Sequence, residues 1–504
     1  MPNASSLRTA MVATERFLGQ AGPLLVVLTA AVYYALYYRA GLNLGGEGGT
    51  NAVLALRLME GQRPIADTFL GYNLLWFYPL IALFKVTGPD YVAMRIFFFV
   101  LCTINALLGY AIVRSVTRQA WLALAVSILL VLVPGMIFRN YMGLIGVLSS
   151  LLLLKAYVLP AATTRGQIGW MAAAGAGMSI CFLLRIEPSF LLAVVWLGLA
   201  VLYPFGPRRD CLPRLRTTLV GTAAGVAILL AVHTGAAWHA QQRGFGEQFV
   251  GQYSTFLGML GYELSRETEK LLPASAPSAA AAPSRPGTAT AVATESAPAE
   301  AREARLARPP LGKIWEAPRP RDRYFGLCLY YPVFWGSTLV GAAAVMLALS
   351  VLRGDADTKQ KALVILTATG CSLSLFPQYF WFRPDAPHLS EFMVPFLPAV
   401  AVSSWAVWSA AYTARTRAWR FAAAAVITLS ALLVPIYLKA IMPREDAGTI
   451  FSMREPTRFR ALNGVDVVLS PADAAAIGGL RDAVLNHSSP GEFVVVYPYA
   501  PTIN

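Results

Sequence analysis

Residues 41–80 read GLNLGGEGGTNAVLALRLMEGQRPIADTFLGYNLLWFYPL and combine a glycine-rich loop, a short amphipathic segment and the start of an apolar run. Glu47 stands among four glycines, so bulky neighbours do not shield its carboxylate and the backbone can approach a substrate closely. Apolar residues recur at helical spacing from Ala52 to Met59, which predicts an amphipathic helix on a membrane surface. Asp67 follows that helix, so two carboxylates bracket it. The alternative is that both are solvated loop acids among glycine turns.

The chain is too apolar for a soluble enzyme. Hydrophobic residues make up 56 % of its 504 residues and charged residues 13 %, against about 25 % charged residues in soluble proteins; mean hydropathy is +0.54. A disordered chain is excluded for the same reason. The net charge of +14 does not indicate a nucleic-acid partner, because basic residues of a membrane protein first mark its cytoplasmic loops. The five cysteines have no paired spacing, so we expect small core residues.

Apolar runs long enough to cross a hydrocarbon core about 30 Å thick number about twelve. They lie near residues 23–41, 71–88, 91–113, 119–137, 140–160, 168–184, 187–205, 216–238, 328–351, 361–379, 391–413 and 418–440. The densest Arg and Lys clusters, at 205–217, 352–361 and 413–420, are predicted to be cytoplasmic. If these clusters are cytoplasmic and every run crosses the membrane once, counting back along the chain places the loop between the first two runs in the cytoplasm. That result conflicts with a cytoplasmic N-terminus, which the N-terminal arginines favour. Either a thirteenth span is hidden before residue 168, which we favour, or one run re-enters without crossing.

The predicted fold is an all-α polytopic membrane domain over residues 1–440, with 12 or 13 transmembrane helices and an external first loop at 42–71. An Ala/Pro/Ser tract at 273–310 predicts a mobile external linker without a packed core. The tail 441–504 has a mixed composition, and its helix-like stretch at 471–487 precedes the strand-like FVVVYPY. This pattern predicts a small external α/β element. Because that apolar strand would need partners, we expect the chain to be a fragment of a longer protein.

A second concentration of polar residues lies in the loop FPQYFWFRPDAPHLSEF at 376–392. Arg383, Asp385 and His388 fall within six residues there, beside four aromatic residues. Arginine presents a fork of donors suited to phosphate oxygens, and the neighbouring Asp and His could orient it or bind hydroxyl groups. The plainer interpretation of the aromatic rings is a membrane-interface belt. No histidine elsewhere has ligand spacing to His388, so a metal is not indicated.

A third group, Arg185 and Glu187, lies between two apolar runs in GMSICFLLRIEPSFLLAVV. Ionisable residues at membrane depth are costly and usually line a cavity or pair with each other. A local ion pair at an external turn is the simpler alternative, and Arg95 and Arg139 have the same status. The chain has no glycine-rich phosphate loop followed by Lys and Ser or Thr. A lipid-borne donor therefore suits it better than a nucleotide-borne one.

Residues from Glu47 to Arg95 resemble the first external loop and second span of the GT-C glycosyltransferases, in the bacterial branch similar to protein O-mannosyltransferases and aminoarabinose transferases. The matching features are a loop acid, a helix ended by glycine, a proline, an acid, an aromatic and apolar span, and a glycine followed by an arginine. In this chain they are Glu47, Gly61, Pro64, Asp67, Tyr72 to Leu83, Gly88 and Arg95. The resemblance is specific over about sixty residues. Members commonly begin this loop with two adjacent acids, whereas this chain has Gly-Glu-Gly, and counting back from Gly61 puts Glu47 at or next to the catalytic position.

The resemblance implies inverting transfer of a sugar from a polyprenyl-phosphate donor to a glycan, lipid or protein acceptor, at the outer face of the bacterial cytoplasmic membrane. Such a reaction needs a carboxylate that takes the acceptor proton and cations that hold the leaving phosphate. The expected base is Glu47, with Asp67 positioning or assisting it. The residues expected to bind the phosphate are Arg185 and Arg383, and those expected to contact sugar or acceptor are Glu187, Asp385 and His388. Nothing in the sequence requires a metal, although some GT-C relatives use a divalent one.

Two alternatives from other classes stay open. In a transporter or flippase of a lipid-linked saccharide, the same charged residues would line a path, although the chain has no convincing internal repeat. A non-catalytic envelope-assembly protein would explain the missing second acid.

Overall fold

The computed structural model describes residues 4–41, 47–67, 72–159, 161–207, 211–271, 325–382, 386–413, 455–460 and 466–487, with a few isolated positions. For some helical residues, Glu47 among them, the description covers the backbone alone. The predicted linker at 273–310, nearly all of the apolar run at 418–440 and the strand-like FVVVYPY lie outside the described residues.

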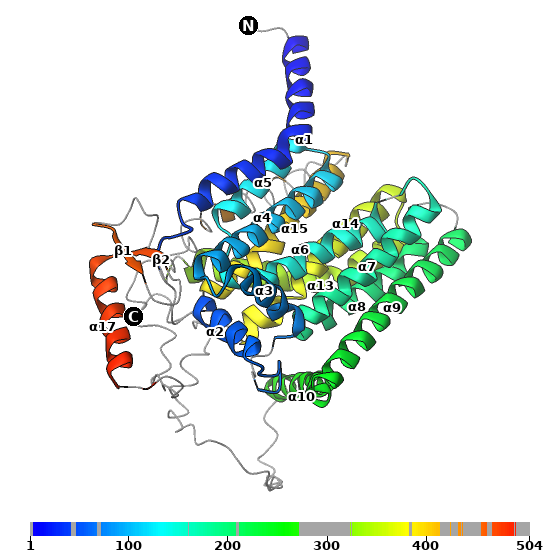
Figure 1. Ribbon diagram of the computed structural model, residues 1–504. Coiled ribbons are helices and arrows are strands. Elements are labelled where there is room, and N and C mark those ends of the chain that lie inside the picture. Colours follow the sequence, from blue (N-terminus) through cyan, green and yellow to red (C-terminus); the bar gives the residue numbers. More distant parts are fainter. Residues whose placement is uncertain are drawn as a thin grey trace.

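The described chain is a helical bundle with a small sheet beside it (Figure 1). Its helices are α1 (Ala4–Ala35), α2 (Glu47–Met59), α3 (Leu74–Thr87), α4 (Tyr91–Thr117), α5 (Ala120–Leu132), η1 (Ile137–Arg139), α6 (Tyr141–Leu153), η2 (Leu154–Val158), α7 (Thr164–Leu184), α8 (Ile186–Leu202), η3 (Tyr203–Phe205), α9 (Cys211–Gln242), α10 (Gly246–Leu271), η5 (Phe325–Tyr330), α13 (Tyr331–Arg353), α14 (Ala356–Leu373), η6 (Gln378–Phe382), α15 (Ala386–Thr413) and α17 (Pro471–His487). The strands are β1 (Thr457–Arg460) and β2 (Asp466–Leu469), which pair antiparallel.

The all-α membrane fold is confirmed: within the described residues, eight helical segments are long and apolar enough to cross a membrane. Two further apolar helices, α3 and α5, are shorter. The number is lower than the predicted 12 or 13 partly because the run at 418–440 lies almost wholly outside the described residues, and partly because three other runs form short or charged helices. The runs at 71–88 and 119–137 form these short helices, and the run at 361–379 belongs to α14, whose first two turns carry Asp357, Lys359 and Lys361.

Helices α3 and α4 begin at the same end of the bundle. In its first turn the indole of Trp76 donates to the Asn51 side chain at 3.0 Å, and the Asn51 amide donates to the Phe138 carbonyl at 2.9 Å. The next helix, α4, starts only a few residues after α3, and the ring of its first residue, Tyr91, lies 6.0 Å from the Phe138 ring. The start of α3 and the start of α4 therefore lie at the same end of the bundle, so α3 does not run from one end of the bundle to the other. We call this end of the bundle the first-loop end.

The opposite end of the bundle carries the basic loops, and α1 begins there. Arg114, near the end of α4, pairs with Glu15 of α1 at 2.9 Å, and Lys359 of α14 donates to the Phe205 carbonyl at 2.8 Å. With α3 not crossing, the start of α1 and the predicted cytoplasmic loops share one side. A hidden thirteenth span, the alternative we favoured, is not needed to reconcile the described helices with the charges.

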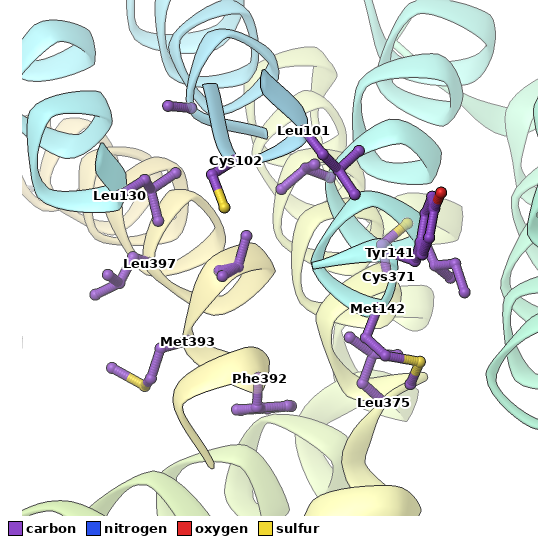
Figure 2. Close-up of a cluster of buried hydrophobic side chains, with 14 of the residues drawn as sticks. Leu101, Cys102, Leu130, Tyr141, Met142, Cys371, Leu375, Phe392, Met393 and Leu397 are labelled. Carbon is purple, nitrogen blue, oxygen red and sulfur yellow. The ribbon is translucent and has the colours of Figure 1, made fainter. Parts of the chain in front are cut away.

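The core holds α15 tightly against α6 and so fixes the start of α15. Figure 2 shows apolar side chains from α4, α5, α6, α14 and α15 converging, with Cys102 and Cys371 among them. The prediction that the cysteines are core residues is confirmed for these two and for Cys181, but it is wrong for Cys211, which is exposed, and Cys328 is only partly buried. A Cβ on Gly143 would lie 2.7 Å from Val394, and one on Gly146 would lie 2.5 Å from Pro395. These two glycines, one turn apart on α6, therefore permit close approach of α15.

The predicted helix at 471–487 is α17, which lies beside the β1–β2 hairpin (Figure 1). Strand β2 also pairs with the segment that follows α1, through a parallel bridge between Ala40 and Val468. The small C-terminal element is therefore attached to the first-loop end of the bundle.

Candidate functional site

Buried charged and polar side chains meet at the first-loop end of the bundle, although they come from segments far apart in the sequence. They lie on η1, at the junction of α7 and α8, on η6 and in the first two turns of α15. We call this set the arginine network; its members are Arg139, Arg185, Glu187, Gln378, Tyr379, His388 and Glu391.

Arg139 is the most deeply buried cation of the network, with 1 % of its side chain exposed. Its Nε lies 2.9 Å from Glu391 Oε1 in an ion pair, and the Tyr379 hydroxyl donates to the other carboxylate oxygen at 2.5 Å. Its Nη1 lies 2.9 Å from His388 Nε2. Because a guanidinium can only donate, Nε2 of His388 accepts, which requires a neutral imidazole with its proton on Nδ1.

Arg185 lies at the more open edge of the network. Its guanidinium donates from Nε to Glu187 at 2.9 Å and from Nη2 to Gln378 at 3.2 Å. Its face covers the ring of Tyr72, with 5.2 Å between the guanidinium carbon and the ring centroid, in a cation–π contact. The Glu187 side chain is 28 % exposed, against 10 % for Arg185. This pair is therefore the part of the network that an incoming group can reach.

The two arginines belong to one electrostatic unit because η6 joins them. Gln378 accepts from Arg185, and its neighbour Tyr379 donates to the carboxylate that pairs with Arg139. Each buried cation is balanced by one carboxylate, since a buried ion without a partner would be strongly destabilising. An anion that replaced a carboxylate would meet two arginines in a medium where charges are only weakly screened.

The first turn of α2 packs directly against the segment that carries Arg139. A Cβ on Gly48 would lie 2.8 Å from the ring of Phe138, the residue before Arg139, and Asn51 binds the Phe138 carbonyl. Glu47 is the first residue of α2 and lies one turn before Asn51, so the two share a helix face. The backbone of the predicted base is therefore close to η1; its side chain lies outside the description.

Asp67 lies on the exposed surface of the first loop, where Arg63 binds it. Its carboxylate accepts from the Arg63 backbone at 2.7 Å, and from guanidinium atoms Nε at 3.2 Å and Nη2 at 2.9 Å. The same guanidinium donates to the carbonyl of Gly244, in the turn between α9 and α10, at 3.1 Å. Asp67 therefore orients the Arg63 guanidinium, which links the first loop to that turn.

We expect Asp67→Asn to loosen this part of the loop. Arg63 holds the pKa of the Asp67 carboxyl below its usual value near 3.9. The pair is therefore intact above about pH 4 and is lost as the pH falls through the lowered pKa. Hydrogen exchange of residues 61–67 should therefore rise at neutral pH in the variant, whereas in the native chain it should rise only in acid. Unchanged exchange at residues 61–67 would show that the ion pair does not hold this part of the loop.

The structure brings Arg185, Glu187 and His388 together, whereas Arg383 and Asp385 lie outside the described residues. Sequence reasoning had noted Arg139 but assigned it no role, and it had missed Gln378 and Glu391. One signal could have found Glu391, since it is an acid at the start of a long apolar run and such a residue is a functional candidate by default. Among the described residues, no group of three or more His, Cys, Asp or Glu could hold a metal ion.

No family model and no curated protein matches the chain. Two solved structures match it at low similarity, and both are crystal structures of ArnT from Cupriavidus metallidurans. The apo structure shares 15 % identity with a TM-score of 0.36, covering 84 % of this chain and 77 % of that one. The structure bound to undecaprenyl phosphate shares 13 % identity with a TM-score of 0.36, covering 91 % and 87 %. This likeness is too low to transfer any residue role.

Proposed function

We propose that this chain is an integral-membrane glycosyltransferase that moves a sugar from a polyprenyl-phosphate donor to a glycan, lipid or protein acceptor. One observation carries the proposal: Arg139 and Arg185 lie in a single buried network at one end of an apolar helical bundle. Two arginines in a membrane-embedded site suit a ligand with an anionic head and an apolar tail. A polyprenyl phosphate has both parts, because its prenyl chain can lie among the helices.

Binding of the phosphate begins at Arg185, in this proposal. Arginine forms two parallel hydrogen bonds with phosphate oxygens as it does with carboxylate oxygens. The phosphate can therefore take the place of Glu187, the partner that forms the ion pair with Arg185 and is more exposed than it. Arg139 adds the second positive charge from within, and His388 positions Arg139 by accepting from Nη1. Arg383 is retained as a further phosphate ligand, and Asp385 as a contact for sugar or acceptor. Glu187 and His388, which the sequence predicts to contact sugar or acceptor, are instead assigned to the binding of Arg185 and Arg139.

Transfer then needs only one proton acceptor and stabilisation of the leaving group. The acceptor hydroxyl attacks the anomeric carbon on the face opposite the phosphate, the bond from carbon to phosphate oxygen breaks, and the configuration inverts. Glu47 takes the hydroxyl proton as general base. The two arginines stabilise the negative charge that develops on the leaving phosphate. Packing of the first turn of α2 against η1 supports this assignment.

The site would face away from the cytoplasm. The basic loops and the start of α1 lie at the opposite end of the bundle, and the positive-inside rule places such loops in the cytoplasm. We therefore propose that the chain resides in a bacterial inner membrane with its first-loop end on the periplasmic side.

Arg185→Gln tests the proposal through donor binding. The purified variant should bind a polyprenyl phosphate about 10 to 100 times more weakly than the native chain, which corresponds to the loss of charge-assisted hydrogen bonds. Arg185→Lys keeps the positive charge but cannot form two parallel hydrogen bonds, so its affinity for the polyprenyl phosphate should lie between those of Arg185→Gln and the native chain. The control ligand is the polyprenol without its phosphate, which the native chain and both variants should bind with equal affinity. Equal affinity of the native chain for the phosphate and the alcohol would refute the proposal.

A further inference from the structure

The segment between α1 and α2 is held by a buried arginine. The Arg95 side chain, on α4, is fully buried. Its guanidinium donates from Nη1 to the Ala40 carbonyl at 2.7 Å and from Nη2 to the Gly41 carbonyl at 2.9 Å. Weaker contacts reach the carbonyls of Tyr37 and Tyr38. Arg95 therefore satisfies a set of backbone acceptors that would otherwise be buried at a cost.

The same segment is held on its other side by the C-terminal element. The Gly41 N–H donates to the Val468 carbonyl at 2.9 Å, and the Val468 N–H donates to the Arg39 carbonyl at 2.8 Å. Strand β2 therefore pairs with residues 39–41 along one edge and with β1 along the other. Val467 and Leu469 of β2 are buried, so the contact includes apolar packing as well as hydrogen bonds.

Asp466 strengthens this contact through a cluster of arginines. Its carboxylate receives two hydrogen bonds from Arg458, at 2.7 and 2.5 Å, and lies 3.6 Å from Arg460 and 3.9 Å from Arg39. Arg39 belongs to the held segment, whereas the other two arginines belong to β1. The hydrogen bonds from Arg458 lower the Asp466 pKa to about 2, so the carboxylate is charged at every physiological pH.

From these contacts we infer that the C-terminal element, β1 to α17, is a positioning device for the loop that carries the proposed base. After Gly41 the chain has only five more residues before α2 begins at Glu47, and α2 is itself held by Asn51. Fixing residues 39–41 therefore fixes where that loop starts. Asp466 and Arg95 are positioning residues in this view, and the element stays docked during turnover. This inference rests on the proposed function.

The test uses two variants that weaken docking by different means. Asp466→Asn removes the charge at the centre of the cluster. Val468→Pro removes the N–H that donates to Arg39, and the β1–β2 ladder should survive because Val468 directs its N–H and carbonyl away from β1. Both should lower kcat for sugar transfer about 10- to 100-fold, leave polyprenyl-phosphate affinity within about twofold, and raise hydrogen exchange at residues 37–41. Arg481→Ala, on α17, is the control, because its guanidinium binds the adjacent Asp482.

A disulfide provides the rescue. Ala40 and Val468 are bridge partners, and paired strands lie about 4.8 Å apart, which is within the Cα range for disulfides. Addition of Ala40→Cys and Val468→Cys to Asp466→Asn should restore kcat under oxidising conditions. Reduction of the disulfide should lower kcat again. Raised exchange with unchanged kcat, or an inactive oxidised protein, would overturn the inference. A native chain that bound no polyprenyl phosphate would refute the proposed function instead, and exchange at 37–41 would still report docking.

Discussion

Replacing Arg139 by methionine is expected to abolish measurable binding of a polyprenyl phosphate and to destabilise the chain by about 3–5 kcal/mol. Methionine has a similar length but no charge, so Glu391 would remain buried beside Tyr379 without its cation. Both effects have one cause, namely the loss of a cation that balances a buried carboxylate and would face the incoming phosphate. Thermal unfolding in detergent and a lipid-binding assay would measure them separately.

A double variant separates the two roles of Arg139. In Arg139→Met with Glu391→Gln, the orphaned charge is gone and the amide oxygen can still accept from Tyr379, so most of the lost stability should return. Binding of the phosphate should not return, because Arg139 is still missing. Arg114→Met is the matched control, since Arg114 pairs with Glu15 at the basic end with about a third of each side chain exposed; it should keep full binding. A double variant that bound the phosphate as the native chain does would make Arg139 purely structural.

The helical membrane fold could be predicted from the sequence because a run of about twenty apolar residues has the length of a helix that crosses a membrane. The path of α3 could not be predicted in this way. Its run is as apolar as a true span, and whether it crosses is decided by where the chain lies after it, at the contact between Tyr91 and Phe138 at the first-loop end. Parity of the basic loops showed that one run was anomalous, but parity alone does not identify which.

The sequence predicts the kind of side chains that form the site, but only some of the residues themselves. Arg185 and Glu187 are two residues apart, so their ion pair could be read locally. Arg139 and Glu391 come from opposite halves of the chain, and the sequence gives no sign that they meet. Their contact depends on Gly143 and Gly146, which allow α15 to approach α6. Which two helices approach each other closely depends on the packing of the whole bundle, so it could not be predicted from the residue pattern of either helix.

Glu47→Gln is expected to slow sugar transfer about 10²- to 10⁴-fold, the usual contribution of a general base, while affinity for the polyprenyl phosphate stays unchanged. Glutamine has nearly the same shape and cannot take a proton, so α2 should still pack against Phe138 through Gly48. The matched control is Glu60→Gln, just after the last residue of the same helix on its exposed side, which should transfer sugar at the native rate.

The same variant distinguishes the three classes of function that the sequence left open. An enzyme loses transfer and keeps donor binding. A flippase would show no transfer in either form, and in vesicles it would move the lipid-linked sugar between leaflets at a rate that depends on Arg139 and Arg185. An assembly protein would show neither transfer nor movement. Transfer by Glu47→Gln at the native rate would remove Glu47 from the mechanism. Glu187 would then be the next candidate to test, because displacement by the phosphate would free its carboxylate at the open edge of the network.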